Sequence, residues 1–254
     1  MKPIAWYKSL ALAKNRREYG CFLIEGRRAV EQVLTYHRAC VEELLCVDDA
    51  ASSIPTSTGV PIRTISGPNM KSICTSKTPQ GIAALVRIPA DTYTSKIPES
   101  SKKSQRVLLL EHIQDPGNAG TLIRTAAAFG VDGVIMSDQC ADPFSPKVVQ
   151  STAGSVLSLW IRKTDQYISM ADELKNQHKY KLIAADLNGS ESHEFIKGVN
   201  QHILALGNEG SGLSGGILDR CDYRIKIPIV ESGAESLNVA SSGAICMFML
   251  SSRR

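Results

Sequence analysis

Three short segments of this 254-residue chain combine asparagine, arginine, glutamate and serine with glycines, and each follows an apolar run. They are 115–124, 206–214 and 227–238. Such polar groups can orient a small organic ligand, and glycines let the backbone approach it closely. In open α/β sheets, ligands bind beyond the carboxyl ends of the strands. The three segments therefore predict a single small-molecule site.

The glycines of the second segment allow two other interpretations. Gly210 to Gly215 matches the G-x-G-x-x-G dinucleotide fingerprint, and Glu231 follows about twenty residues later. That fingerprint usually opens a fold, whereas here only one helix is expected after Glu231. In addition, Glu209 lies where a pyrophosphate would bind. A nicotinamide oxidoreductase is one alternative, and a tight turn without a ligand is the other.

The polar residues of these segments also have structural explanations. Asn118 can cap the helix that follows it, and either Ser236 or Asn238 can cap the last helix. Arg124 falls among small and apolar neighbours, where its head either reaches solvent or offers a planar donor fork to phosphate or carboxylate. His112, at a strand end, either contacts substrate or has a structural role.

The elements that must position these residues alternate in the second part of the chain. Continuous apolar strands separated by helices indicate a parallel sheet covered on both faces. The expected strands are 107–112, 133–136, 181–185, 202–206 and 223–227. The expected helices are 118–129, 146–158, 168–178, a short turn after Ser214, and 237–251.

The first part of the chain predicts a smaller α/β/α sandwich. Helices are expected at 6–17 and 27–36, and strands at 21–24, 41–47, 62–65 and 81–88. Residues 89–105 are rich in proline, serine and lysine, which is typical of a linker. We therefore expect a domain at 1–88, a linker at 89–105 and a second domain at 106–254.

The distribution of charge and the spacing of the cysteines indicate which partners and which kinds of site to expect. Residues 1–105 hold 15 Lys and Arg against 9 Asp and Glu, whereas the rest holds 14 against 16, so the front is basic. A basic module suits an anionic macromolecule, although a solvated basic surface is the alternative. The seven cysteines include no C-x-x-C pair, so we expect reduced thiols, no metal site and a cytoplasmic protein. No apolar run approaches the ~20 residues of a membrane span.

Taken together, the three segments resemble the signature motifs of the SpoU (TrmH-like) RNA ribose 2′-O-methyltransferases of the SPOUT superfamily. Asn118, Gly120 and Arg124 fit the first motif, residues 207–213 the second, and Ile227-Pro228 with Ser236-Leu237-Asn238 the third. The match covers about 106–251. More loosely, residues 22–36 are similar to the start of the family's substrate-binding domain, which is typical of members that act on ribosomal RNA.

The resemblance implies a deep trefoil knot in the back domain, a homodimer, and S-adenosylmethionine bound at the knot. It places Leu206, Gly207, Ile227 and Leu237 around that cofactor. It makes Arg124 the catalytic arginine, with Asn118, Glu209, Ser236 and Asn238 shaping the site. A guanidinium pKa lies above about 12, so we favour an electrostatic or phosphate-binding role for Arg124 over that of general base.

The expected substrate is RNA, more specifically large-subunit ribosomal RNA, with transfer RNA as the alternative. Phosphate contacts position RNA without reading its sequence. The residues expected to make them are Lys14, Arg16, Arg17, Arg27 and Arg28. A non-catalytic RNA-binding or ribosome-assembly protein of the same fold remains a competing hypothesis. A titration with S-adenosylmethionine would separate it from an enzyme.

Overall fold

The computed structural model describes residues 2–48, 59–99, 105–190, 199, 201–230 and 235–251. Glu231 of the fingerprint alternative therefore lies outside the described residues. The chain divides into two compact units, each treated separately below. The front unit comprises residues 1–90 and 142–158, and the back unit comprises residues 91–141 and 159–254. Among the described helices, none is long and apolar enough to cross a membrane.

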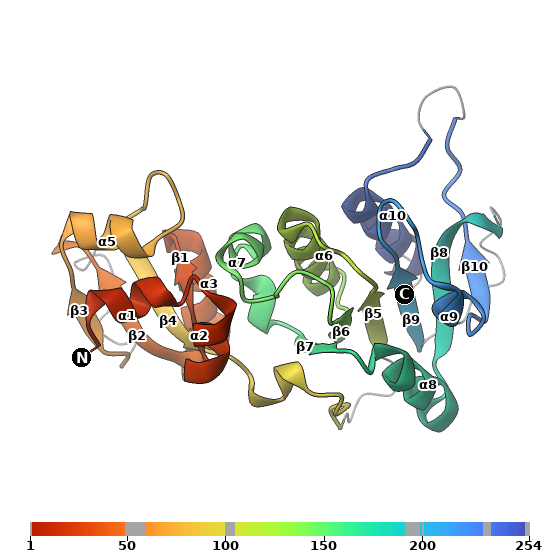
Figure 1. The fold of residues 1–254 in the computed structure, drawn as a ribbon, viewed down its shortest axis with the longest axis horizontal. Coiled ribbons are helices and arrows are strands. Elements are labelled where there is room, and N and C mark those ends of the chain that lie inside the picture. The colour runs from red at the N-terminus through yellow and green to blue at the C-terminus, as the bar shows by residue number, and fades with distance from the viewer. Residues whose placement is uncertain are drawn as a thin grey trace. The chain divides into compact units, whose positions relative to one another are not determined.

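The front unit is built on a four-stranded sheet with the order β1-β4-β2-β3 (Figure 1). Three of its strands pair antiparallel, and β3 is parallel to β2. The strands are β1 (Cys21–Glu25), β2 (Val41–Cys46), β3 (Ile62–Thr64) and β4 (Ile82–Arg87). The helices are α1 (Ile4–Ser9), α2 (Ala13–Tyr19), α3 (Arg27–Tyr36), η1 (Arg38–Cys40), α5 (Gly67–Ile73), α7 (Pro146–Thr152) and η4 (Ser155–Leu157).

Helices cover both faces of this sheet, which confirms the expected α/β/α sandwich. On one face, Tyr7 of α1 and Met70 of α5 pack on Leu45 and neighbouring strand residues. On the other face, α3 contacts β1 and β4, and α7 contacts β1. The rings of Phe22 and Phe144 lie 4.6 Å apart there, so a segment far along the chain completes the front unit.

The single helix expected at 6–17 is instead two short helices, α1 and α2. The chain turns between them, and the buried guanidinium of Arg16 donates hydrogen bonds of 2.8 Å to the carbonyls of both Leu10 and Ala11. These carbonyls face a side-chain donor instead of continuing the helical ladder. The period of the apolar residues persists across the turn, which is why the sequence suggested one helix.

The back unit contains a six-stranded sheet in the order β10-β8-β9-β5-β6-β7, and every pair is parallel. This confirms the expected parallel α/β architecture. The strands are β5 (Arg106–Leu110), β6 (Gly133–Ser137), β7 (Trp160–Thr164), β8 (Lys181–Ser190), β9 (His202–Leu206) and β10 (Tyr223–Ile225). The helices are η3 (Ala90–Tyr93), α6 (Pro116–Ala128), α8 (Tyr167–His178), α9 (Gly215–Leu218) and α10 (Val239–Ser251).

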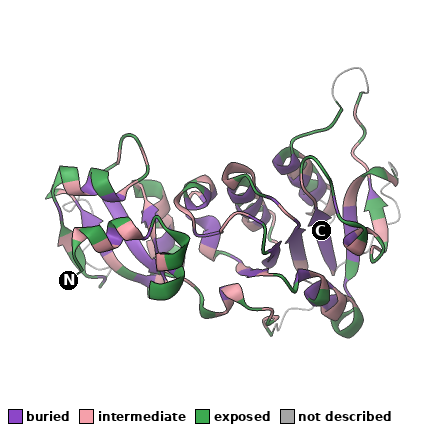
Figure 2. Ribbon diagram, viewed as in Figure 1, coloured by how far each residue is buried: buried purple, intermediate pink, exposed green. Residues whose placement is uncertain are grey.

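Two layers of helices enclose this sheet. On one face, α8 and α9 bury Met170, Leu174 and Ile217 against Val107 and Ile203. On the other face, α6 and α10 pack against each other and against the strands. Gly243 of α10 permits this contact, because a Cβ there would lie 2.3 Å from Leu122 and 2.7 Å from Leu206. Figure 2 shows the buried residues concentrated on the central strands.

Two features of the back half of the sequence differ from expectation. The helix expected at 146–158 ends at Thr152, where Ala153 and Gly154 adopt positive φ angles of 50° and 93°. The strand β7 was not expected, because it contains Arg162 and Lys163. Both side chains are buried, and backbone carbonyls accept their hydrogen bonds, so these charges do not mark a solvent-facing loop.

Candidate active site

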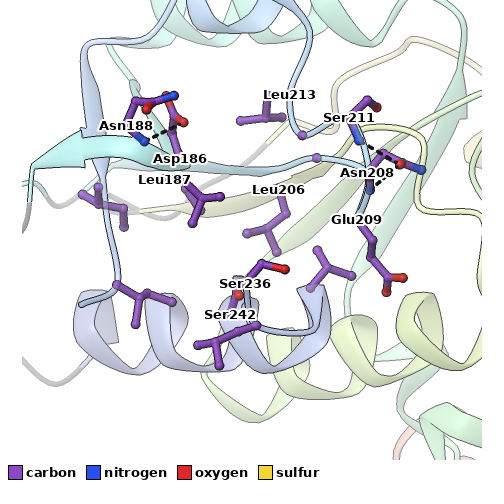
Figure 3. Close-up of a pocket in the computed structure, with 18 of the residues that line it drawn as sticks. Asp186, Leu187, Asn188, Leu206, Asn208, Glu209, Ser211, Leu213, Ser236 and Ser242 are labelled. Carbon is purple, nitrogen blue, oxygen red and sulfur yellow. Dashed lines mark hydrogen bonds between the residues drawn. The ribbon is translucent and has the colours of Figure 1, made fainter. Parts of the chain in front are cut away.

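A cavity of about 360 Å³ lies beside the second half of β8, beyond the carboxyl end of β9, and beside the chain that follows β10. Its volume falls in the range of small-molecule pockets, about 300–1,000 Å³. Most of its wall comes from residues 185–188, from residues 206–213, and from described residues in 225–229 and 236–242. Figure 3 shows them around the cavity, with Asp186 and Glu209 at opposite ends of the view. The site therefore lies where a parallel sheet is expected to bind its ligand.

The loop after β9 is shaped by Asn208. Its backbone pairs with Gly212 through hydrogen bonds of 3.0 and 2.9 Å, which closes a tight turn. Its side-chain oxygen accepts hydrogen bonds from the amides of Gly210 and Ser211, and its side-chain amide donates to the carbonyl of His112. Gly212 has a φ of +68°, which favours glycine. Gly212, which ends this turn, is therefore explained by its backbone conformation.

Three polar side chains from different segments meet beside the cavity. The Asn118 side-chain amide donates to Glu209 Oε1. The Asn238 side-chain amide lies 3.1 Å from Asn118 Oδ1 and 3.3 Å from Glu209 Oε1. The structure thus joins α6, the loop after β9 and the start of α10. We call Asn118, Glu209 and Asn238 the polar cluster.

One of the two helix caps expected from the sequence is present, and the other is formed by a different residue. Asp115 caps α6, because its carboxylate accepts the amide of Asn118 at 2.8 Å. The side chain of Asn118 is therefore available to the polar cluster instead of capping. At the other helix, Asn238 accepts the amides of Ala240 and Ser241, so it caps α10 as well as joining the cluster.

Arg124 lies on the exposed side of α6, two turns beyond Asn118. It is not among the residues that line the cavity, and the described residues provide no hydrogen bond or ion pair to its guanidinium. The structure therefore places Arg124 on the same helix as the polar cluster but outside the cavity. An exposed guanidinium is free to bind an anion that approaches from solvent.

The four residues expected around a cofactor, and Ser236 with them, all line the cavity: Leu206, Gly207, Ile227, Leu237 and Ser236. Gly207 approaches other backbone closely, because a Cβ at that position would lie 2.2 Å from the carbonyl carbon of Gly212. The sequence missed the stretch Asp186 to Asn188, which also lines the wall. Its position at the end of a parallel strand was the signal that could have found it.

The charge of the cavity wall is negative. Its ionisable lining residues are Asp186 and Glu209, and no lysine, arginine or histidine belongs to the described lining. Arg224 lies 3.7 Å from Asp186, whereas the partners of Glu209 in the polar cluster are neutral amides. The wall is mainly apolar and includes Glu209, a carboxylate with no cationic partner among the described residues. Such a wall fits S-adenosylmethionine, which has a flat base and a cationic sulfonium.

His112 contributes to the scaffold of the site. It adopts a positive φ of 58°, its amide donates to Ser137 Oγ at 3.0 Å, and its carbonyl accepts from Asn208. Its ring meets Tyr167 edge-on at 6.4 Å. These contacts agree with the structural interpretation of this histidine. Over the described residues, no group of three or more His, Cys, Asp or Glu side chains is arranged to hold a metal ion.

Four of the five basic residues expected to bind phosphates are exposed on the front unit, namely Lys14, Arg17, Arg27 and Arg28. Arg16 differs from that expectation. It is 2% exposed, and its guanidinium contacts Asp142 at 2.6 Å as well as the carbonyls at the α1–α2 turn. Because these contacts use the guanidinium inside the front unit, Arg16 is not part of a phosphate-binding surface.

Comparison with known proteins agrees with this geometry. Residues 105–248 match the SpoU rRNA Methylase family, and residues 4–84 match the MRM3-like substrate binding domain. The 23S rRNA (guanosine(2553)-2′-O)-methyltransferase RlmP of Bacillus subtilis is 32% identical over 96% of this chain and 94% of its own length.

Solved structures show the same fold over the whole chain. A putative RNA methyltransferase of the TrmH family from Porphyromonas gingivalis superposes with a TM-score of 0.83, at 28% identity and full coverage of both chains. The SpoU methyltransferase AviRb from Streptomyces viridochromogenes, solved with AdoMet, has a TM-score of 0.82 at 23% identity, covering 99% of this chain and 97% of its own. With its signature segments, its cavity and these matches, the chain belongs to the SpoU family of S-adenosylmethionine-dependent RNA methyltransferases.

Proposed function

We propose that this protein methylates a ribose 2′-hydroxyl in large-subunit ribosomal RNA. The observation that carries the proposal is the polar cluster, which joins the cofactor cavity to α6, the helix that bears Arg124. The similarity to a 23S rRNA 2′-O-methyltransferase along almost the whole chain supports both the reaction and the substrate. Such a substrate agrees with the cytoplasmic location expected from the sequence.

The residues that would hold the cofactor are those of the cavity wall. Leu206, Ile227 and Leu237 would enclose the adenine, and Glu209 would face the positive charge. S-adenosylmethionine, when bound, supplies a methyl group already activated by its sulfonium. The protein therefore has to orient the ribose hydroxyl and to balance the charge that develops as its oxygen takes the methyl group and its proton passes to water. Orientation of this kind can lower a barrier by up to about 7–11 kcal/mol.

Arg124 is the residue we assign to that charge. Its exposed guanidinium would bind the RNA phosphate beside the target ribose and stabilise the negative charge developing on the 2′-oxygen. Asn118, Glu209 and Asn238 would fix the ribose through the same hydrogen-bonding groups that hold the cluster together. Ser236, on the cavity wall, would contribute a hydroxyl to the same site.

Replacing Arg124 with alanine tests this assignment. We expect Arg124→Ala to lower the methylation rate of a 23S rRNA fragment by roughly 100-fold or more, the usual effect of losing a transition-state donor. Its affinity for S-adenosylmethionine, measured by calorimetry, should stay within about twofold because Arg124 lies outside the cavity. Lys147→Ala, which also removes an exposed positive charge from a helix, is the control. Near-normal methylation by Arg124→Ala would refute the assignment.

The choice of RNA needs a separate experiment. Ribose methylation in ribosomal and transfer RNA from cells without the gene can be mapped by mass spectrometry and compared with wild type. Loss of one methylated ribose in large-subunit RNA is the expected outcome. Loss in transfer RNA would keep the chemistry and replace the substrate. An unchanged map, together with a purified protein that does not bind S-adenosylmethionine, would favour a non-catalytic RNA-binding protein.

We further propose that the front unit presents the RNA-binding surface. Its residues 4–84 match a substrate binding domain, and Lys14, Arg17, Arg27 and Arg28 place positive charge on its exposed surface. RNA affinity should therefore fall steeply as salt is raised, since each phosphate contact releases counterions. We keep the division into 1–88, 89–105 and 106–254 and the trefoil knot of the back domain as parts of this proposal.

A homodimer completes the proposal. Apart from its serines, helix α10 consists of apolar residues and one glycine, and its exposed side carries Ile245 and Phe248, which are 37% and 58% accessible. A helix that is hydrophobic all round is usually buried. A second copy of the chain would cover this side of α10 and bring another α6 and polar cluster near the first.

A further inference from the structure

Glu111 is a buried carboxylate directly after β5, outside the three signature segments. It is 1% exposed, and no ion pair of Glu111 occurs in the part of the chain that the structure describes. Three donors satisfy it. Tyr167 OH and Ser214 Oγ each donate to Oε1 at 2.7 Å, and the Ser214 amide donates to Oε2 at 2.7 Å. Burying a carboxylate without a cation is unfavourable unless such hydrogen bonds compensate for the lost water.

Two of these three bonds hold the loop that lines the cofactor cavity. Ser214 immediately follows the lining residues 206–213 and directly precedes α9. The other end of the loop is held nearby, because the Glu111 amide donates to the Leu206 carbonyl and the Asn208 side chain donates to the carbonyl of His112. Residues 111 and 112 therefore anchor both ends of the stretch 207–214.

Tyr167 supports this arrangement from α8. Burial raises the pKa of the Tyr167 phenol, and the hydrogen bond to Glu111 adds to the rise, so the phenol remains a donor. It contacts Glu111 but neither lines the cavity nor bonds to the loop 207–214. Removing its hydroxyl would weaken the support of Glu111 without touching the bonds between Glu111 and Ser214.

We propose that Glu111 is a positioning residue that holds the loop 207–214 in the shape that receives the methyl donor. An acceptor-only side chain is suited to this task, because all three partners are donors. A glutamine would present an amide to at least one of them. The inference rests on the proposed binding of S-adenosylmethionine in the cavity. Because Glu111 holds Ser214, loss of Glu111 should weaken the binding of this cofactor.

Cofactor affinity and stability, measured together, test the proposal. The variants Glu111→Gln, Ser214→Ala and Tyr180→Phe would be titrated with S-adenosylmethionine by calorimetry and melted without it. We expect Glu111→Gln to raise Kd roughly tenfold, the effect of losing about one well-formed hydrogen bond, and Ser214→Ala to raise it several-fold. Tyr180→Phe is the matched control, because it removes another buried phenol hydrogen bond of the back unit, the one to Gln105, and should lower Tm while Kd stays within about twofold.

A double variant separates positioning from general destabilisation. If Glu111 acts through Ser214, Glu111→Gln with Ser214→Ala should bind no more weakly than Glu111→Gln alone. Loss of affinity that simply follows Tm across all variants, Tyr180→Phe included, would overturn the inference, as would normal affinity in Glu111→Gln. Failure of the wild-type protein to bind S-adenosylmethionine would instead overturn the proposed function.

Discussion

His202, at the start of β9, shows how a single buried residue ties stability to pH. It is 4% exposed, and none of the residues that the structure describes forms a hydrogen bond with its Nδ1. Burial and, to a smaller extent, the neighbouring Arg106 lower the pKa of this imidazole to about 4, while a hydrogen bond to the Val199 backbone opposes the shift. In the unfolded chain the histidine pKa is near ~6.5. The folded protein therefore holds a neutral imidazole where the unfolded chain takes up a proton.

This difference predicts a loss of stability in acid. Above about pH 6.5 both states are neutral and His202 has no effect. As pH falls from there toward 4, only the unfolded state is protonated, so the free energy of unfolding should fall by about 2 kcal/mol at pH 5. Urea denaturation of wild type and His202→Gln at pH 7 and pH 5 would measure this change. The free energy of unfolding should fall less between the two pH values in the variant than in wild type.

An exposed histidine provides the control for this prediction. His178→Gln changes a solvent-facing residue at the end of α8, so its pH profile should follow wild type. Parallel profiles for wild type and His202→Gln would contradict the assignment of the acid sensitivity to His202. Other titrating groups affect all three proteins equally, so the comparison isolates the one imidazole.

The loop after β9 is the element on which the cofactor site depends most directly. Gly207 begins this loop, and a Cβ there would lie 2.2 to 2.4 Å from backbone atoms of Gly212 and Leu213. The Gly212 carbonyl accepts one of the two hydrogen bonds that close the turn, so it cannot move away without opening the turn. Gly207→Ala should therefore weaken S-adenosylmethionine binding at least roughly tenfold, a loss of about 1.4 kcal/mol, in a direct titration.

Gly210→Ala is the matched control in the same loop. A Cβ at this position would lie 3.5 Å from Asn208 Oδ1, which is an ordinary contact. The affinity of Gly210→Ala for S-adenosylmethionine should therefore stay within about twofold of wild type. If both variants bind equally well, the tight turn is not needed for the cofactor. If both fail, the loop tolerates no side chain and the close approach at Gly207 is not the cause.

Helices and strands were predictable from the sequence where the apolar residues are the buried ones and the polar residues the exposed ones. The helix α3 and the strand β9 have the bounds expected from their apolar periods. The strand β7 was missed because Arg162 and Lys163 read as polar, although each is buried against carbonyls from other segments. The split of α1 from α2 likewise depends on Arg16, whose partner Asp142 lies 126 positions away. No local pattern contains such a contact.

At the scale of the whole molecule, the exposed side of α10 predicts self-association. Phe248 is 58% exposed. Among the described aromatic rings it contacts Phe129, edge-on, with the ring centres 6.2 Å apart. A second copy would bury it, and burial of an aromatic side chain contributes about 1.5–3 kcal/mol. Light scattering during size-exclusion chromatography should give a dimer for wild type and a monomer for Phe248→Glu.

The control for the dimer is an exposed leucine elsewhere. Leu12, in the front unit, is 63% exposed, so Leu12→Glu makes the same kind of change without touching α10. It should remain a dimer. A monomeric wild-type protein, or a dimeric Phe248→Glu variant, would remove α10 from the proposed interface.

Residue types and their order were sufficient to identify the family, the parallel α/β sheet and the three segments of the site, because strand ends and glycine turns leave local signatures. The meeting of Asn118 with Glu209 and Asn238, which lie 91 and 120 positions away, required the folded chain. So did the burial of Arg16, the neutral imidazole of His202 and the support of the loop by Glu111. These depend on desolvation and on partners distant in sequence, and both arise only when the sheet and its helices pack together.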